Sequence, residues 1–376
     1  MRNIGRMTAA LCLAAVTVLG SAVKVSAAKA DEWKSVYSGF LNEKLTAEQE
    51  YPDSIDAFSI YDIDADGSPE LIVSQGDYHG AYCMIYTISD GKLTHVGDAG
   101  SNGICGYVPA KKYVTSCYIG MGYMNLDYFT MDKDGLNKVI SFCDDSGNAS
   151  DDNDFEITYT IDEEKVTADE YEKKLGEMQS SSSVTLGRTF PLSEKSIEYA
   201  VTGVSSRKAG YSGLLTECYL ESDYREDGDR FFLSDITGDK KPELFVFTSG
   251  GMDIFTFRDG VVRFFGNEYP YRLNGDDVKC RFGFNAEKKI LVIRMDSAAQ
   301  KTYSYTFCHI GKNGIKKAVD IARTTDSVGD TVYWLNSEYS TQRKVNAALK
   351  KYSGIRFRMS SKFYSLNEDE IKRVLG

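Results

Sequence analysis

Residues 61–73, YDIDADGSPELIV, gather oxygen donors at a spacing that suits a hard cation. Three aspartates at alternate positions repel one another when ionised, so a folded chain must offset their charge or satisfy their oxygens. Calcium accepts six to eight oxygen ligands in flexible geometry, whereas magnesium demands a stricter octahedron. Gly67 supplies a backbone conformation that a residue with a Cβ adopts only at a cost. We therefore predict a calcium site, with side-chain oxygens from Asp62, Asp64, Asp66 and Glu70 and the backbone carbonyl of Ser68.

An EF-hand and an Asx-rich turn are the alternatives for this loop. An EF-hand would carry a bidentate glutamate at its twelfth position, which is Val73 here, and would have helices in place of the alternating FSIY and ELIV. An Asx-rich turn, whose side chains accept hydrogen bonds from nearby backbone amides, stays open. The loop's own ligands could fill the coordination shell, and no adjacent side chain is poised as an acid, base or nucleophile, so a cation there is predicted to join two strands rather than to catalyse.

A second copy of the loop occurs in FFLSDITGDKKPELFV, residues 231–246. Its candidate ligands are Asp235, Thr237, Asp239 and Glu243. A hydroxyl has replaced one carboxylate, and Lys240 stands where the first copy has its glycine. One fewer negative charge and a nearby lysine predict weaker cation binding than in the first loop.

The first loop resembles the D-x-D-x-D-G-x-x-[DE] calcium loop of FG-GAP and VCBS-type repeat proteins, in which the loop joins two β-strands. It is also similar to loops in secreted proteins of anaerobic Gram-positive bacteria that carry D-I-D-x-D-G-x-x-E-L between strands. The resemblance covers about 40 residues in each copy. It implies a cation loop and names no activity.

The loop belongs to a longer duplication. YSGFLNEKL (37–45), FSIYDIDADGSPELIV (58–73), IYTISDGKL (85–93) and FPLSEKSIEYAV (190–201) recur in the same order at offsets of 174, 173, 169 and 174. Two units of about 173 residues, 31–203 and 207–376, are therefore predicted as tandem domains. A divergent β-propeller, which would make both copies one domain, is an alternative that the helices at the ends of each copy argue against.

The predicted fold class is α+β, with each unit an antiparallel β-meander sheet flanked by an N-terminal helix and two C-terminal helices. The opening helix is indicated by Trp33, Tyr37 and Leu41 at helical spacing. Turn pairs at Asp90-Gly91, Asp134-Gly135, Asp259-Gly260 and Asn313-Gly314 indicate hairpins. Thr167 and Glu170 form a capping box ahead of a closing helix.

Residues 1–30 are predicted to be a signal peptide, because a basic start precedes an apolar run and small residues that suit a signal peptidase. Its removal leaves 40 basic and 55 acidic side chains, a net charge of −15. That charge opposes binding to nucleic acid and to anionic membranes. We expect a secreted, extracellular protein with no membrane attachment after cleavage.

Seven cysteines follow the signal peptide, and no two of them form a C-x-x-C pair. Zinc ribbons and thioredoxin-like chemistry therefore have no support. Export permits disulfides, but an odd number leaves at least one thiol over. Burial as small hydrophobic side chains is the default expectation for most of them.

The expected function is a non-enzymatic binding module whose partner is an extracellular glycan or protein. The chain has 25 tyrosines, and exposed tyrosines bury area on a partner at low entropic cost. The segment SCYIGMGYMNLDYF (116–129) is either a binding platform or part of a core. The alternative function is a secreted hydrolase that uses the loop QGDYHGAY around His79, although no established catalytic motif is present.

Overall fold

The computed structural model describes most of the chain after residue 31. The described residues are 32–47, 54–120, 122–146, 157–179, 183–220, 228–248, 251–268, 279–285, 287–298, 301–311, 314–325, 329–336, 338–360 and 363–376. The predicted signal peptide, residues 1–30, lies outside them.

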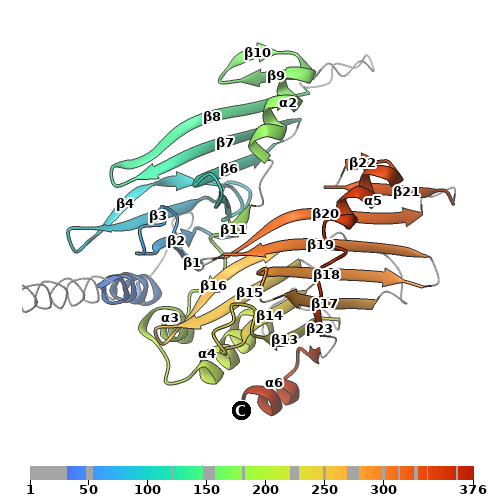
Figure 1. The fold of residues 1–376 in the computed structure, drawn as a ribbon. Helices are drawn as coiled ribbons and strands as arrows, with labels where there is room; N and C mark the ends of the chain where they lie inside the picture. The colour runs from blue at the N-terminus through green and yellow to red at the C-terminus, as the bar shows by residue number, and fades with distance from the viewer. Residues whose placement is uncertain are drawn as a thin grey trace, which may run out of the picture.

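The first half of the chain forms two antiparallel sheets (Figure 1). In spatial order the five-stranded sheet contains β12 (Phe190–Pro191), β1 (Ala57–Tyr61), β2 (Glu70–Ser74), β3 (Cys83–Ser89) and β4 (Lys92–Ala99). The seven-stranded sheet contains β10 (Glu164–Val166), β9 (Thr158–Ile161), β8 (Gly135–Asp145), β7 (Tyr123–Asp132), β6 (Tyr113–Ile119), β5 (Cys105–Val108) and β11 (Val184–Leu186).

The second half repeats this strand order. Its five-stranded sheet contains β24 (Tyr364–Ser365), β13 (Arg230–Ser234), β14 (Glu243–Thr248), β15 (Gly251–Arg258) and β16 (Val261–Glu268). Its seven-stranded sheet contains β22 (Glu338–Ser340), β21 (Thr331–Leu335), β20 (Ile315–Thr325), β19 (Thr302–Ile310), β18 (Ile290–Ser297), β17 (Lys279–Asn285) and β23 (Arg358–Ser360).

The helices are short and dispersed between the sheets. They are a helix over residues 32–46, α2 (Ala168–Gln179), α3 (Glu194–Ile197) continuing into the π-helix η1 (Glu198–Thr202), α4 (Arg207–Leu214) continuing into η2 (Leu215–Leu220), α5 (Gln342–Lys350) and α6 (Glu368–Leu375). The predicted capping box is confirmed, because the Thr167 hydroxyl accepts from the Glu170 amide and the Glu170 carboxylate accepts from the Thr167 amide.

The predicted fold class is wrong. The chain is mostly β, with four antiparallel sheets rather than one meander sheet in each unit. Nor do two helices close each unit together, because β11 and β12 separate α2 from α3, and β23 and β24 separate α5 from α6. These strands have only two or three residues, too few to leave a periodic signal in the sequence.

One hydrophobic core joins the two halves. Both five-stranded sheets bury side chains in it together with helix 32–46, η1, α4, η2 and α6, and Figure 1 shows these helices on one side of the sheets. The rings of Phe190 and Phe255 meet across the two halves at 6.3 Å. Nearby, the Thr185 amide donates to Asn267 Oδ1 at 3.3 Å. The buried aromatic contact stabilises the association of the two halves because it removes apolar surface from water.

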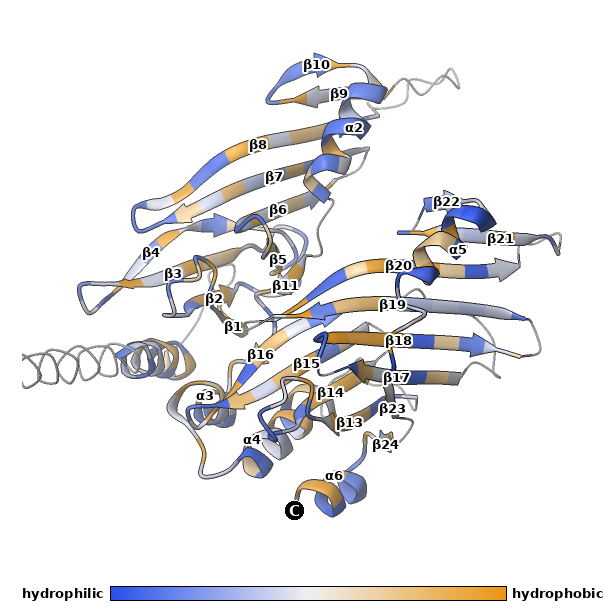
Figure 2. Cartoon of the chain, viewed as in Figure 1, coloured by the Kyte–Doolittle hydropathy of each residue, from blue (hydrophilic) through white to orange (hydrophobic). Residues whose placement is uncertain are grey.

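Each seven-stranded sheet has its own smaller core under one helix. Tyr171 and Met178 of α2 pack on the first of these sheets, and Val345 of α5 packs on the second. Figure 2 shows hydrophobic residues along central strands such as β18 and β19 and mainly hydrophilic residues on α5. These sheets therefore extend outward from the shared core.

The shared core predicts that the halves unfold together. Phe255 is fully buried, so Phe255→Ala should cost about 3–5 kcal/mol through lost burial and the cavity left behind. Calorimetry should show one unfolding transition that moves to lower temperature as a whole. Two separate transitions, of which only one shifts, would contradict a shared core.

Candidate metal centre

The first Asp loop connects β1 to β2, and it brings three acidic side chains together. One oxygen each from Asp62, Asp64 and Glu70 lie within 4.8 Å of one another. These three residues could hold a metal ion. The donors are all carboxylate oxygens, which suit hard cations such as calcium or magnesium rather than soft metals. Asp66, predicted as a further ligand, lies outside this group, and its side chain is exposed.

Glu70 is the buried member of the group. It opens β2, is 1% exposed, and accepts a 2.7 Å hydrogen bond from the Ile63 amide at the other end of the loop. The Thr87 hydroxyl donates to its second oxygen at 3.3 Å. Burial, followed by repulsion from the three aspartates, raises the pKa of Glu70 well above its usual value. A cation beside Glu70 would offset that repulsion and favour the ionised carboxylate.

The aspartates also shape the loop by themselves. Asp64 accepts from the Asp66 amide at 2.9 Å, and Asp66 accepts from the Ser68 amide at 2.7 Å. Two residues adopt left-handed backbone, Ala65 at φ +60° and Gly67 at φ +99°. The Asx-turn alternative is therefore realised in the hydrogen bonds. Since a carboxylate has two oxygens with several acceptor sites, these bonds are compatible with a cation.

Residues from three other elements hold the loop in place. The Tyr37 hydroxyl on helix 32–46 donates to the Pro69 carbonyl at 2.7 Å. The Tyr107 hydroxyl on β5 donates to the Ile63 carbonyl, and the Lys112 ammonium in the β5–β6 turn donates to the Asp64 carbonyl. Lys112 and Tyr107 have no sequence signal that would link them to the loop, because the contacts span more than 40 residues.

The second Asp loop, between β13 and β14, is held by an equivalent buried glutamate and an equivalent tyrosine hydroxyl. Glu243 is buried and accepts from the Ile236 amide at 2.9 Å, and the Tyr211 hydroxyl donates to the Pro242 carbonyl at 3.1 Å. Gly238 and Lys240 take the left-handed conformations that Ala65 and Gly67 take in the first loop. Lys240 therefore replaces a glycine without changing the path of the backbone.

The chemistry of the second loop nevertheless differs from that of the first. Thr237, which stands at the position of Asp64, donates a 3.1 Å hydrogen bond to Glu243 Oε1. Asp235 accepts from the Gly238 and Lys240 amides, and Asp239 accepts from the Lys241 amide. Within the described residues these side chains do not form a group of three possible metal ligands. A hydrogen bond from an uncharged hydroxyl thus takes the place of the second carboxylate of the first loop.

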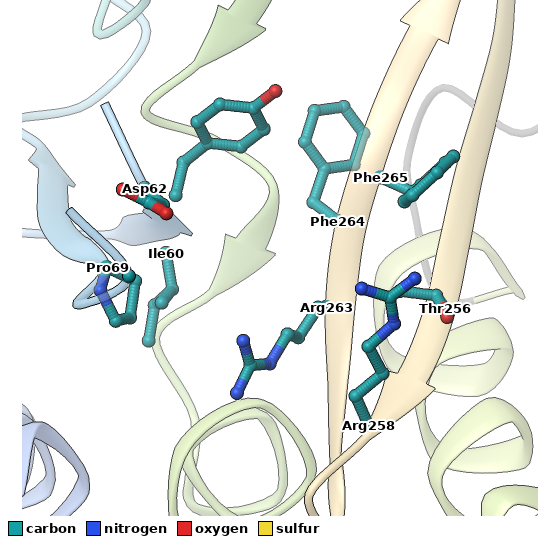
Figure 3. A pocket seen from close by; sticks show the side chains of 10 residues that line it. Ile60, Asp62, Pro69, Thr256, Arg258, Arg263, Phe264 and Phe265 are labelled. Carbon is teal, nitrogen blue, oxygen red and sulfur yellow. The ribbon is translucent and has the colours of Figure 1, made fainter. Parts of the chain in front are cut away.

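A small pocket opens beside the first loop, where it faces the second half (Figure 3). Its volume is about 70 Å³, enough for several water molecules that could complete the shell of a cation at Asp62. Arg258 of β15 and Arg263 of β16 line the side across from Asp62. Arg263 is held by Asp259 at 2.9 Å and lies over the Trp33 ring. The sequence does not indicate this pocket, because it depends on how the two halves meet.

Among the residues that the structure describes, the ring of His79 contacts an aromatic side chain rather than a carboxylate or a nucleophile. His79 is exposed, and in the described part of the chain its ring contacts Tyr118 at 4.7 Å between centroids. The Tyr118 ring in turn contacts Tyr123 at 5.5 Å. The other two histidines are also exposed, with His95 paired to Asp98 at 2.7 Å and His309 on β19.

Comparisons with known proteins leave the family open. No family model matches the chain, and no curated protein matches it. Among solved structures, a candidate 6-phosphogluconolactonase from Bacteroides fragilis has 11% identity and a TM-score of 0.18 over 79% of this chain and 96% of its own. A candidate dipeptidyl aminopeptidase IV from Bacteroides ovatus has 10% identity and a TM-score of 0.17 over 79% of this chain and 36% of its own. Such low scores support no inference about fold or activity.

Among the described helices, none combines the length and the apolar character that crossing a membrane requires.

Removing the charge of Lys112 should strengthen cation binding at the first loop. Its ammonium bonds to the Asp64 carbonyl and also stabilises the Asp64 carboxylate, so it competes with a second positive charge. Lys112→Met should lower the calcium Kd several-fold in a calorimetric titration. Lys111→Met is the matched control, because the Lys111 ammonium bonds to Glu177 instead. Weaker binding by Lys112→Met would contradict the competition.

Cation binding should also depend on pH through Glu70. Its raised pKa means that the metal-free folded state holds a proton that the unfolded state loses above its ordinary pKa near 4.5. The stabilising contribution is therefore complete at low pH and is lost as pH rises through the folded pKa. A cation needs the ionised form, so its affinity should fall as pH is lowered from 7.5 to 5.

Glu70→Gln tests this dependence. The glutamine oxygen can still accept from the Ile63 amide, but the side chain no longer titrates. The variant should unfold at a higher temperature than the wild type in EDTA at pH 7.5, and added calcium should not raise that temperature. A variant that is less stable than the wild type in EDTA would show that the charge of Glu70 does not destabilise the metal-free protein.

Proposed function

We propose that this chain is a secreted, calcium-stabilised binding module that acts without catalysis on an extracellular glycan or protein. The observation that carries the metal part is the difference between the two loops. The first loop places Asp64 beside the buried Glu70, where the second loop has a hydrogen bond from Thr237 to Glu243. Adjacent carboxylates in a buried setting are costly without a cation, and the second loop avoids that cost.

Calcium fits this site better than magnesium. The donors come from a loop with two left-handed residues and mixed hydrogen bonding, which suits a cation that tolerates irregular coordination. Binding to the folded state alone would add about 2.7 kcal/mol of stability at a hundredfold excess over Kd.

The role of calcium here is structural. The loop connects neighbouring strands of the five-stranded sheet, and its ends are tied to helix 32–46 and to β5. Catalysis by a bound cation would need an acid, base or nucleophile beside it. Five side chains of the second half line the pocket across from the loop. Arg258 and Arg263 do not act in those roles at neutral pH, Phe264 and Phe265 have no ionisable group, and the Thr256 hydroxyl donates to Glu243.

The binding part of the proposal rests on an aromatic cluster of His79, Tyr118 and Tyr123. The three rings follow one another at 4.7 and 5.5 Å, and Tyr123 is 41% exposed. Within the same predicted platform segment, Leu126 and Tyr128 are buried in the core under α2, whereas Ile119 is 63% exposed. Aromatic rings held against one another present apolar faces at little entropic cost, which suits sugar rings and protein side chains alike.

Paired substitution of the aromatic cluster tests this function. The double variant Tyr118→Ala, Tyr123→Ala should lose binding to the glycans that the wild type binds on an array of bacterial and host glycans. If the wild type binds an extracellular protein instead, the double variant should lose binding to that protein. The calcium-dependent rise in Tm should survive, because these rings lie away from the first Asp loop. Tyr339→Ala is the matched control, since Tyr339 is 75% exposed in the second half.

Two results would contradict the proposal. Full retention of the ligand by the double variant would show that the aromatic cluster is not the binding surface. Hydrolysis of a bound glycan that disappears in His79→Ala would show that the protein is an enzyme.

A further inference from the structure

Two buried cysteines in the first half face each other across the two sheets. Cys83 opens β3 of the five-stranded sheet, and Cys105 opens β5 of the seven-stranded sheet. Their side chains are 0% and 3% exposed. The Cys105 thiol lies close enough to the Cys83 thiol to raise its pKa. Both cysteines are in the reduced form in this structure.

Backbone geometry explains why the two thiols meet. The Cys83 thiol donates to the Gly103 carbonyl at 3.2 Å, two residues before Cys105. It also lies 4.0 Å from the carbonyl of Leu186, and Leu186 is the strand partner of Cys105. A side chain at Gly187 would come within 2.5 Å of the Cys83 sulfur, so the glycine leaves the space that the sulfur fills. The pair is therefore packed tightly from both sheets.

The other described cysteines have different partners or surroundings. The Tyr199 hydroxyl bonds to Cys218, Cys308 contacts Glu268, and the remaining cysteines are only half-buried. In the second half, the position equivalent to Cys83 is Met252, a buried residue that cannot cross-link. The fold therefore does not require a thiol at this point, and the first half carries two cysteines in the same buried cluster.

We propose that Cys83 and Cys105 form a disulfide in the exported protein, which joins the two sheets of the first half. The inference rests on the secretion part of the proposed function, because disulfides persist in oxidising compartments. The cross-link would fix β5, whose Tyr107 holds the first Asp loop, against the sheet that contains the loop's own strands. The disulfide therefore links the sheet that carries the loop covalently to β5, the strand that carries Tyr107.

The chemistry needs a disulfide oxidant, such as oxidised glutathione or an exported thiol–disulfide oxidoreductase. One cysteine thiolate attacks the oxidant and forms a mixed disulfide while one thiol leaves. The second cysteine thiolate then attacks the sulfur of the first and releases the other thiol. In total two cysteine thiols lose two electrons and two protons, and the oxidant is reduced to two thiols.

The bond must form during folding rather than afterwards. The neighbouring Cys105 thiol and burial raise the pKa of Cys83 well above its usual value, which leaves little thiolate in the folded protein. The thiols are also out of reach of an oxidant once the core closes. Folding brings the pair together while both are still accessible.

Peptide mapping after refolding tests the proposal directly. Mature protein is unfolded, reduced and refolded with a mixture of oxidised and reduced glutathione. It is then unfolded in denaturant that contains N-ethylmaleimide, so that buried thiols are also blocked, and digested with trypsin without reduction. Cleavage after Lys92 and Lys111 places the two cysteines on separate peptides. A peptide pair linked through Cys83 and Cys105 should dominate, and the Tm of the refolded protein should exceed that of the reduced protein by a few degrees.

Matched variants make the result specific. Cys105→Ser should leave Cys83 carrying N-ethylmaleimide, whereas Cys117→Ser should retain the linked pair. Recovery of wild-type Cys83 and Cys105 both labelled with N-ethylmaleimide would overturn the proposal, as would a scatter of other pairings. The wild-type map decides even if the serine variant fails to fold. A calcium-dependent Tm shift that persists without the disulfide would leave the proposed function standing.

Discussion

The buried glutamate that opens the second strand of each half is the constraint on which both Asp loops depend. Glu70 and Glu243 each accept from the amide at the start of their loop, and each is 1% exposed. A carboxylate so deeply placed must be satisfied by hydrogen bonds, by a proton or by a cation. The second half uses the Thr237 hydroxyl, and the first half adds a further carboxylate at that place. The same buried glutamate therefore has a hydroxyl donor beside it in the second loop and a second carboxylate beside it in the first.

The surroundings of the two loops reinforce this divergence. In the first half, Lys112 and the pocket with Arg258 and Arg263 set positive charge around the acidic group. Lys112 lowers the pKa of Asp64, and the pocket leaves room for water beside Asp62. Because the pocket is lined from both halves, the shared core that joins them also positions this charge. The packing of the two halves against each other therefore also determines which charges surround the site.

Local features were predictable from the sequence, and the assignment of strands to sheets was not. Asp90-Gly91 and Asp259-Gly260 form the tight hairpin turns that their residue types predict, with positive φ at every position. The split of each half into two sheets leaves no comparable signal, because β11 and β12 are a few residues apart yet join different sheets. The pairing of Asp64 with Glu70 could be identified from the sequence, because aligning the two loops places Thr237 at the position of Asp64. Lys112 and the two arginines could not be assigned to the site, since they reach it through tertiary contacts.

Calorimetric titration of calcium into the wild type, Asp64→Asn and Asp239→Asn tests the cation site at the first loop most directly. Both substitutions keep an oxygen that accepts the amide two residues on, so each loop retains its turn while losing one charge. We predict one calcium per wild-type chain, binding weakened at least about tenfold in Asp64→Asn, a loss of about 1.4 kcal/mol, and no change in Asp239→Asn. Absence of binding by the wild type, or equal effects of the two substitutions, would contradict a cation site at the first loop.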